Sequence, residues 1–478
     1  MVNKKVGYII ISFIAALSIY LGIVFDHLNV YADNATLWIL VIIFLSGVVF
    51  VLGLNFRRHT KETKDYFELI NPILIVFTFY TMMLPINDLI SSRFSDPVTL
   101  FQYVTVAYVG LAGLLAGYFL FQGSKIAERI PRLTIGANEL WLAGTMLLAV
   151  GLLSFAVNVL AFGGLARYFG MGYGAQRYLI IRQQTTFGYG WEWIGLSMFL
   201  FLVAALKQKR RRVNMLLVAF IVLWIVLSFW LGYRRPILYY LFILLISYNY
   251  LFKQVRLWPI LIAAVVFYVI LVAYGYTRSY LPKFGVLRAL SETVGFAFRR
   301  PDLVLPIATG EFNLVARSII EILSAGIAPM KFGESYATAL LAAIPGMGRI
   351  MGGQLLDLGE WRVITFYPGL YEAGAGLGFH ILAEGLLNFG LPGVFLHMFG
   401  YGFVARLAYK YLCRDPKDTL AVVLYASTVP IIVFDAIRSD LTASFFKWTH
   451  TYLCPLLLVM GLAYIINRTV RKGTPQND

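Results

Sequence analysis

The chain has 478 residues, of which 60% are hydrophobic and only 13% are charged, about half the charged share of a soluble globular protein. Its mean hydropathy is +0.76. This composition excludes a soluble domain and predicts an all-α polytopic membrane protein. The net charge of +16 does not indicate nucleic-acid binding, because the basic residues lie at the ends of apolar runs and not in one soluble basic domain.

About twelve apolar runs approach the roughly 20 residues that a membrane-spanning helix needs. The first run follows Lys4 and Lys5 and is too long for the apolar core of a cleaved signal peptide, so we expect an uncleaved first helix. The predicted spans are 6–25, 36–55, 68–86, 99–121, 138–160, 190–206, 213–233, 236–252, 257–277, 389–409, 419–436 and 451–467. We treat residues 1–478 as a single integral membrane domain.

Lysine and arginine gather in short loops on one side of the predicted membrane domain, as in 207–212 and 410–417. The positive-inside rule then predicts cytoplasmic termini in a bacterial inner membrane. Two large loops face outward, 161–189 and, between spans nine and ten, 278–376. Within the second loop, apolar residues recur three and four apart in 286–300 and 313–327, which predicts amphipathic helices.

The outward face is rich in arginine, although the positive-inside rule predicts few positive charges there. Arginine binds phosphate and carboxylate groups in a planar, bidentate manner that lysine cannot reproduce. These side chains are therefore candidates to bind a pyrophosphate and glycan at headgroup depth; the alternative is that they reach lipid headgroups or pair with local acids. The candidates are Arg177, Arg182, Arg234, Arg235, Arg278, Arg299 and Arg300.

Six outward residues are candidates for the acid–base chemistry that a transfer to a hydroxyl group requires. His380 and Glu384 are spaced so that a helix would place them on one face. They lie in an otherwise apolar stretch, and an ionisable residue in such a stretch suggests a functional role. The alternative is a polar pair that ties two helices together. The other outward candidates are Glu311, Glu372, Asp435 and Asp440.

Several other functions lack their sequence signals. The chain has no phosphate-binding loop of the Walker A type, and its five histidines are too scattered for a zinc site. Cys413 and Cys454 do not form a plausible disulfide or metal pair. Acidic residues are scarce in the middle of the spans, which argues against an ion-coupled transporter. We expect no metal and no cofactor.

The chain resembles the Wzy-type O-antigen and oligosaccharide repeat-unit polymerases. The resemblance rests on the many-span architecture, on GESYATALLAAIPG (333–346) inside the long outward loop, and on GFHILAEGLLNFGLPG (378–393) after it. Some members of that family carry an arginine, ten residues and then a glycine in each of two outward loops. Arg177–Gly188 and Arg299–Gly310 fit this spacing.

The resemblance implies a reaction and a fold. Such polymerases transfer a glycan from undecaprenyl pyrophosphate to another lipid-linked repeat unit, on the outer face of the plasma membrane and without metal or nucleotide. It also implies a glycosyltransferase C-like architecture. The expected partners are the lipid-linked oligosaccharide and the membrane, with a chain-length regulator protein as a further candidate. The product would be O-antigen, capsule or a related surface polysaccharide.

Three alternatives stay open. An O-antigen ligase would bind the same donor and differ only in its acceptor. A glycosyltransferase that uses a polyprenyl-monophosphate sugar would need an acid in the first outward loop, where Asp26 and Asp33 lie. A flippase for lipid-linked oligosaccharides would need a cationic, internally repeated cavity, and the sequence has no repeat of fixed period.

Overall fold

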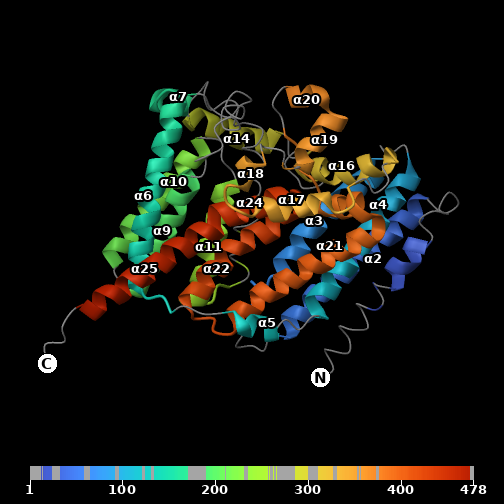
Figure 1. Cartoon of the computed structure of the whole chain (residues 1–478). Coiled ribbons are helices and arrows are strands. Elements are labelled where there is room, and N and C mark those ends of the chain that lie inside the picture. Colours follow the sequence, from blue (N-terminus) through green and yellow to red (C-terminus); the bar gives the residue numbers. More distant parts are fainter. Residues whose placement is uncertain are drawn as a thin grey trace. The chain divides into compact units, whose positions relative to one another are not determined.

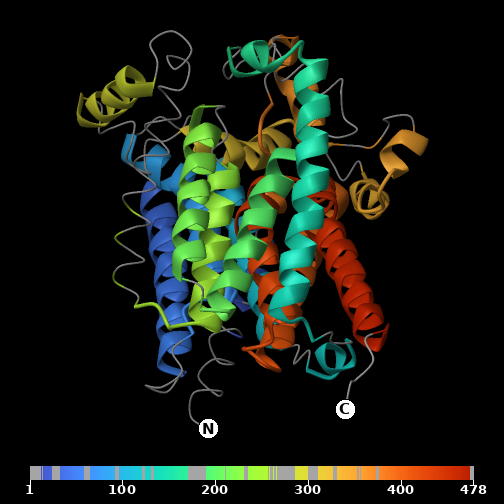
Figure 2. The ribbon, with the colours of Figure 1, turned by 90° about the vertical axis from the view of Figure 1, so that its left-hand side faces the viewer.

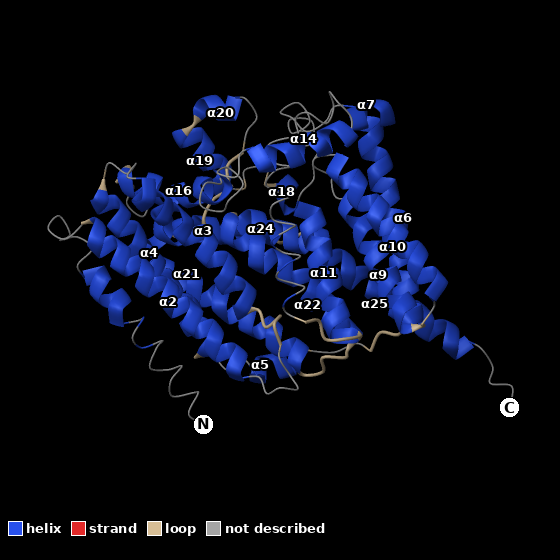
Figure 3. Cartoon of the chain, turned by 180° about the vertical axis from the view of Figure 1, so that it is seen from behind, coloured by secondary structure: helices blue, strands red, loops and turns tan. Residues whose placement is uncertain are grey.

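The computed structural model is built from helices joined by loops, and no strand occurs in the part of the chain that it describes (Figure 3). The described residues are 12, 14, 16–23, 33–58, 65–91, 96–120, 124–130, 134–170, 190–209, 211–230, 235–256, 258, 262, 265, 286–299, 310–326, 331–351, 355, 357–372 and 376–473.

The chain divides into two compact units, and each is assembled from three separate segments of the sequence. Unit 1 comprises 1–130, 302–414 and 431–445, and unit 2 comprises 131–301, 415–430 and 446–478. The chain therefore enters and leaves each unit more than once.

Unit 1 is organised around two helices that lie side by side, α4 (Pro97–Phe119) and α21 (Ile381–Cys413) (Figure 1). Glycines allow the two backbones to approach closely. A Cβ atom on Gly117 would collide with the carbonyl group of Phe399, and one on Gly402 would collide with that of Leu114. Small residues at such positions are typical of helix pairs in membranes, where close packing holds helices together.

The other described elements of unit 1 surround this pair. Helices α2 and α3 flank α4, and α16 packs on both α3 and α4. Their bounds are α2 (Asn34–Arg58), α3 (Ile70–Ser91), α5 (Ser124–Arg129), α16 (Gly310–Ser324), α17 (Glu334–Ala342), α18 (Met347–Ile350), α19 (Leu358–Phe366), α20 (Pro368–Glu372), the π-helical η3 (Ile431–Asp435) and α23 (Ala436–Arg438). Helix α24 (Leu441–Lys447) begins in unit 1 after a break at Ser439 and Asp440.

Unit 2 contains a second close pair, α6 (Ala137–Ala161) and α9 (Gly190–Lys207) (Figure 2). Its interior is aromatic. The rings of Trp191 and Trp224 stack with centroids 5.9 Å apart, and Tyr240 meets Trp224 edge-on at 4.7 Å. The remaining elements are α7 (Leu165–Gly170), α10 (Arg211–Trp230), α11 (Arg235–Leu251), α14 (Val286–Arg299), α22 (Thr419–Pro430), the π-helical η4 (Trp448–Leu453) and α25 (Cys454–Gly473).

Within the described residues, eight helices are long and apolar enough to cross a membrane, as expected for a multi-pass membrane protein. They are 34–56, 70–91, 97–119, 137–161, 190–207, 381–413, 419–438 and 441–469. Each overlaps a predicted span. The predicted spans 213–233 and 236–252 correspond to the shorter apolar helices Met215–Ser228 and Pro236–Leu251. Most of the predicted span 257–277 and much of 6–25 lie outside the described residues, so the total of twelve stays a prediction.

Two details of the predicted elements can be compared with the structure. The amphipathic helices expected at 286–300 and 313–327 are present as α14 and α16. The span expected to start at residue 389 begins eight residues earlier, at Ile381. Phe389 and Gly390 are non-helical inside α21, and Gly390 has a φ of 65°. The prediction therefore began at this kink and missed the helical turns before it.

Candidate active site

Glu384 is the centre of a buried polar cluster near the start of α21, and its side chain is 0% exposed. One carboxylate oxygen, Oε1, accepts a hydrogen bond of 2.7 Å from the Ser335 hydroxyl, and the other, Oε2, accepts one of 2.7 Å from the backbone N–H of Leu441. The side-chain amide of Asn388 donates to Ser335 Oγ at 2.8 Å. We call Ser335, Glu384, Asn388 and Leu441 the Glu384 cluster; it joins α17, α21 and α24.

The local sequence explains how these groups meet. Helix α17 follows Gly333, whose φ of 87° favours glycine, and the Gly333 N–H donates to Asn388 Oδ1 at 2.9 Å. Leu441 opens α24, so its N–H has no acceptor within its own helix and is free to bind the carboxylate. The breaks in the backbone thus supply the donors that Glu384 needs. Non-helical backbone is tolerated among membrane helices only where other protein groups or water satisfy it.

A second carboxylate, that of Asp440, is buried beside this cluster. Its oxygens accept hydrogen bonds from the backbone N–H groups of Leu358 at 2.5 Å and Ala443 at 2.8 Å. Burial raises the pKa of Asp440 well above its ordinary value, and the negative charges of Asp357 and Glu384 raise it further. Within the described residues, Glu384 and Asp440 are both held by neutral donors.

A buried ion pair holds the stretch that precedes α21. The guanidinium of Arg362 forms a fork with Glu321, with Nε–Oε2 and Nη2–Oε1 distances of 2.6 Å, and its Nη1 donates to the Gly378 carbonyl at 2.5 Å. Tyr367 donates to Glu321 Oε1 at 2.7 Å. Burial raises the pKa of Tyr367, and its hydrogen bond to Glu321 adds to that effect. This arrangement ties α16 and α19 to the start of α21.

His380 caps the N-terminus of α21 from an extended backbone conformation. Its Nδ1 accepts the Leu382 N–H at 3.1 Å, so the ring is neutral with its proton on Nε2, which lies 3.4 Å from Thr81 Oγ1. The backbone N–H of His380 donates to Ser318 Oγ at 3.1 Å. The side chain is 0% exposed. His380 and Glu384 therefore share one helix terminus but bind different partners.

The predicted phosphate ligands are mostly not described. Arg299 is exposed at the end of α14, where its Nη2 lies 2.8 Å from Glu292 Oε2. For Arg235 in α11 and Glu311 in α16 only the backbone is described. Arg177, Arg182, Arg234, Arg278 and Arg300 lie outside the described residues. The seven arginines belong to unit 2, whereas His380, Glu384 and Glu311 belong to unit 1.

Sequence reasoning singled out neither the partners of Glu384 nor Arg317. Arg317 is exposed on α16, and its charge acts on Tyr367 beside the Arg362–Glu321 pair. Arg317 and Glu321 are four residues apart, so a helix makes them neighbours. This spacing was the sequence signal that could have identified Arg317. Asn388 follows Glu384 by the same spacing. Ser335 and Leu441 are 49 and 57 residues from Glu384 in sequence, and no local pattern indicates them.

Long apolar helices around a buried, hydrogen-bonded carboxylate cluster define a multi-pass membrane protein with an ionisable site among its spans. A family model described as O-antigen polysaccharide polymerase Wzy matches residues 8–469, and the chain belongs to this family. The resemblance noted in 333–346 and 378–393 is thereby confirmed. Comparisons with curated proteins and with solved structures found no match. The protein is a polymerase of the O-antigen repeat-unit type, acting on lipid-linked oligosaccharides in the membrane.

Proposed function

We propose that this protein transfers a growing glycan from undecaprenyl pyrophosphate to the terminal sugar of another lipid-linked repeat unit. The reaction takes place on the outer face of a bacterial inner membrane, in a glycosyltransferase C-like bundle of about twelve spans with both termini in the cytoplasm. It uses no metal and no nucleotide. The observation that carries the proposal is the family match over 8–469, nearly the whole chain.

In this proposal Glu384 is the general base that takes the proton from the acceptor hydroxyl. Its Oε1 already accepts a hydrogen bond from one hydroxyl group, that of Ser335, at 2.7 Å. A sugar hydroxyl is the same kind of donor, so it can replace Ser335 at this oxygen with one hydrogen bond lost and one gained. Because the described partners of Glu384 are neutral, proton uptake breaks no ion pair. His380 and Glu311 are the alternative bases.

The leaving pyrophosphate is stabilised by outward arginines. Charge-assisted donors that face the developing negative charge lower the barrier to its departure. The candidates are Arg177, Arg182, Arg234, Arg235, Arg278, Arg299 and Arg300, to which we add the exposed Arg317 of unit 1. Arg317 is favoured by its place next to Tyr367 and Glu321, close in sequence to the residues that hold the start of α21.

The reaction is tested with purified protein and lipid-linked repeat units as the only substrate. A polymerase forms a ladder of products that differ by one repeat unit. A ligase forms no ladder unless a lipid A core acceptor is added, and a flippase forms no covalent product at all. A glycosyltransferase for polyprenyl-monophosphate sugars adds single sugars rather than whole repeats. If correctly folded protein forms no ladder, the proposal is refuted.

Replacing the pyrophosphate ligands should reduce polymerisation strongly. Loss of one charge-assisted contact in a partly dry site costs roughly 1.5–3 kcal/mol, or about ten- to a hundredfold in rate. We expect this loss for Ala at Arg278, Arg299, Arg300 or Arg317, with partial recovery in the Lys variants because the fork geometry is lost. Initial rates of ladder formation measure it.

Arg288→Ala provides the matched control, because Arg288 is an exposed arginine of the same helix as Arg299. It should polymerise like the wild-type protein. Equal rates for the wild type and the Ala variants at Arg278, Arg299, Arg300 and Arg317 would place the pyrophosphate site elsewhere. Wild-type rates in the Lys variants would instead show that charge alone is sufficient.

A further inference from the structure

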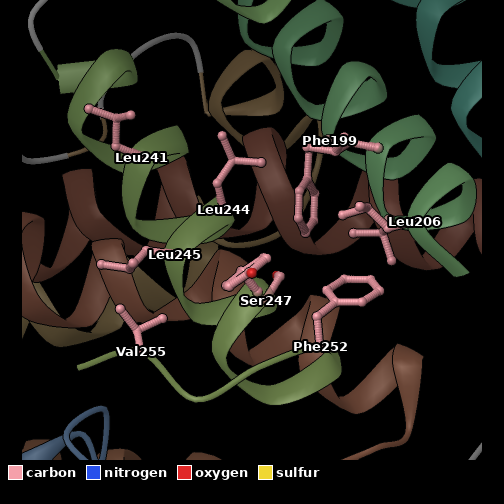
Figure 4. Close-up of a pocket in the computed structure, with 11 residues that line it drawn as sticks. Phe199, Leu206, Leu241, Leu244, Leu245, Ser247, Phe252 and Val255 are labelled. Carbon is pink, nitrogen blue, oxygen red and sulfur yellow. The ribbon is translucent and has the colours of Figure 1, made fainter. Parts of the chain in front are cut away.

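Unit 2 contains an apolar cavity of about 440 Å³ between α9 and α11 (Figure 4). This volume lies within the range of roughly 300–1,000 Å³ that small-molecule sites occupy. Phe199 and Leu206 of α9 face Leu244 and Ser247 of α11, and Phe252 and Val255 close the end of the cavity in the segment that follows α11. The cavity is therefore built mainly from two helices that are themselves apolar along their length.

The closing segment is held in place by hydrogen bonds. The backbone N–H of Lys253 donates to the Tyr248 carbonyl at 3.0 Å, and the N–H of Val255 donates to Asn249 Oδ1 at 2.9 Å. The chain thus turns back under the end of α11, which brings Val255 against the cavity. A wall fixed in this way is a formed site and not a chance gap between side chains.

Positive charge lies next to the closed end. Lys253 and Arg256 are exposed and directly follow the lining residues Phe252 and Val255, and the exposed Lys209 comes three residues after Leu206. Each belongs to the basic loops that mark one side of the membrane domain. An apolar cavity with cations at its end matches a molecule with a hydrocarbon tail and an anionic head, and basic sites of this kind between membrane helices bind acidic lipid headgroups.

One polar atom in the wall of the cavity has no partner. Ser247 is 2% exposed, and no described residue makes a hydrogen bond with its hydroxyl. In Figure 4 Ser247 lies on the α11 side of the cavity, and its oxygen is covered by neighbouring atoms. A buried hydroxyl normally has a partner, because leaving it without one costs free energy. A lipid ester oxygen entering the cavity would supply an acceptor for it.

We infer that this cavity binds one anionic glycerophospholipid, with an acyl chain among the α9 and α11 side chains, an ester oxygen near Ser247 and the phosphate on Lys253 and Arg256. The site lies at the basic end of unit 2, so the lipid comes from the leaflet on that side. It is separate from the Glu384 cluster and does not depend on the polymerase reaction.

The test measures lipid binding to the purified full-length protein by native mass spectrometry, with phosphatidylglycerol, phosphatidylethanolamine and undecaprenyl phosphate as separate probes. We expect one phosphatidylglycerol to be retained at least fivefold more tightly than phosphatidylethanolamine. Each cation near an anionic headgroup contributes a factor of roughly five, so the Lys253→Gln, Arg256→Gln double variant should weaken phosphatidylglycerol binding at least tenfold. Ser247→Phe, which adds a phenyl ring to the wall of the cavity and obstructs it, should abolish retention.

Two matched control variants distinguish the contribution of the cations to lipid binding from that of the cavity. Lys125→Gln with Arg129→Gln removes two exposed cations of α5 in unit 1 and should leave binding unchanged. Ser247→Ala keeps the cavity open and should lower affinity less than tenfold.

Equal affinity for the two phospholipids, or tighter binding of undecaprenyl phosphate, would overturn the inference. So would unchanged phosphatidylglycerol binding in the Gln double variant, or displacement of the lipid by soluble glycerol phosphate, which needs no cavity. The exposed position of Lys253 and Arg256 makes their replacement compatible with folding.

Discussion

The two ends of α21 hold their buried carboxylates in opposite ways. At the start of the helix, Glu384 accepts hydrogen bonds only from a hydroxyl and a backbone N–H among the described residues. Towards the far end, Arg406 Nη1 donates to Glu68 Oε1 at 2.9 Å, and Tyr118 and Asn55 also donate hydrogen bonds to Glu68. The guanidinium of Arg406 also lies 5.0 Å from the Tyr118 ring centroid.

The difference separates a group that can react from one that holds the fold. A carboxylate paired with arginine stays charged, and losing one partner of such a buried pair is costly. Glu384 has no such counter-ion among the described residues, so it can exchange a proton while its neighbours stay in place. Glu68 and Glu384 are 2% and 0% exposed, so burial does not distinguish them; their donors do.

The same substitution at both glutamates should have opposite effects. Glu384→Gln keeps the shape and one of the two acceptor positions but removes the proposed base, so turnover should fall by about 10²–10⁴-fold while most of the protein abundance is retained. Glu68→Gln leaves the Arg406 charge without its partner, so abundance and unfolding temperature should fall while turnover per folded molecule is kept. Ladder rates and melting curves measure both.

The His380→Ala variant tests whether His380, and not Glu384, is the base. If Glu384→Gln polymerises normally and His380→Ala does not, His380 takes the role of base. If both variants lose their folded state, the two residues form a structural clasp between helices and have no part in the chemistry. Normal ladders from both would direct attention to Glu311 and Asp435.

Removing the arginine at the far end should cost stability. Arg406→Met leaves Glu68 buried and charged without its cation, which costs roughly 3–5 kcal/mol. Adding Glu68→Gln removes that unpaired charge and should restore part of the loss. Thermal unfolding in detergent measures both variants. A single Arg406→Met variant as stable as the wild type would remove the contrast between the two ends of α21.

Asp440 gives the smallest expected effect and a defined dependence on pH. Because its folded-state pKa is raised above the ordinary value of 3.8, its contribution to stability is complete below that value and is lost as pH rises through the folded pKa. The unfolding temperature of the wild type should therefore fall from acid to alkaline pH. In Asp440→Asn this decline should be weaker, and the variant should be about 0.5–1.5 kcal/mol less stable in acid, where one hydrogen bond is lost. Parallel pH profiles for both proteins would contradict this account.

The sequence predicted the helices better than the site. Apolar run length located the spans, and periodicity located α14 and α16, because both signals are local. His380 and Glu384 became candidates because ionisable residues are rare in apolar stretches. The partners of Glu384 could not be found, since Leu441 contributes a backbone N–H that exists as a donor only because the helix breaks at Ser439 and Asp440. The pairing of Arg362 with Glu321, 41 residues apart, depends on tertiary structure in the same way.

The division of unit 1 into separate segments has a consequence for its biosynthesis. Glu384 precedes its donor Leu441 by 57 residues, and Asp440 reaches Leu358 across 82. At a synthesis rate of roughly 5–20 residues per second, the Glu384 carboxylate leaves the ribosome about 3–11 seconds before the N–H that will bind it. During that interval α21 must enter the bilayer with an acid that is only partly satisfied, or wait at the insertion machinery until the last spans arrive. A nascent chain stalled before residue 441 would therefore be a natural substrate for membrane quality control.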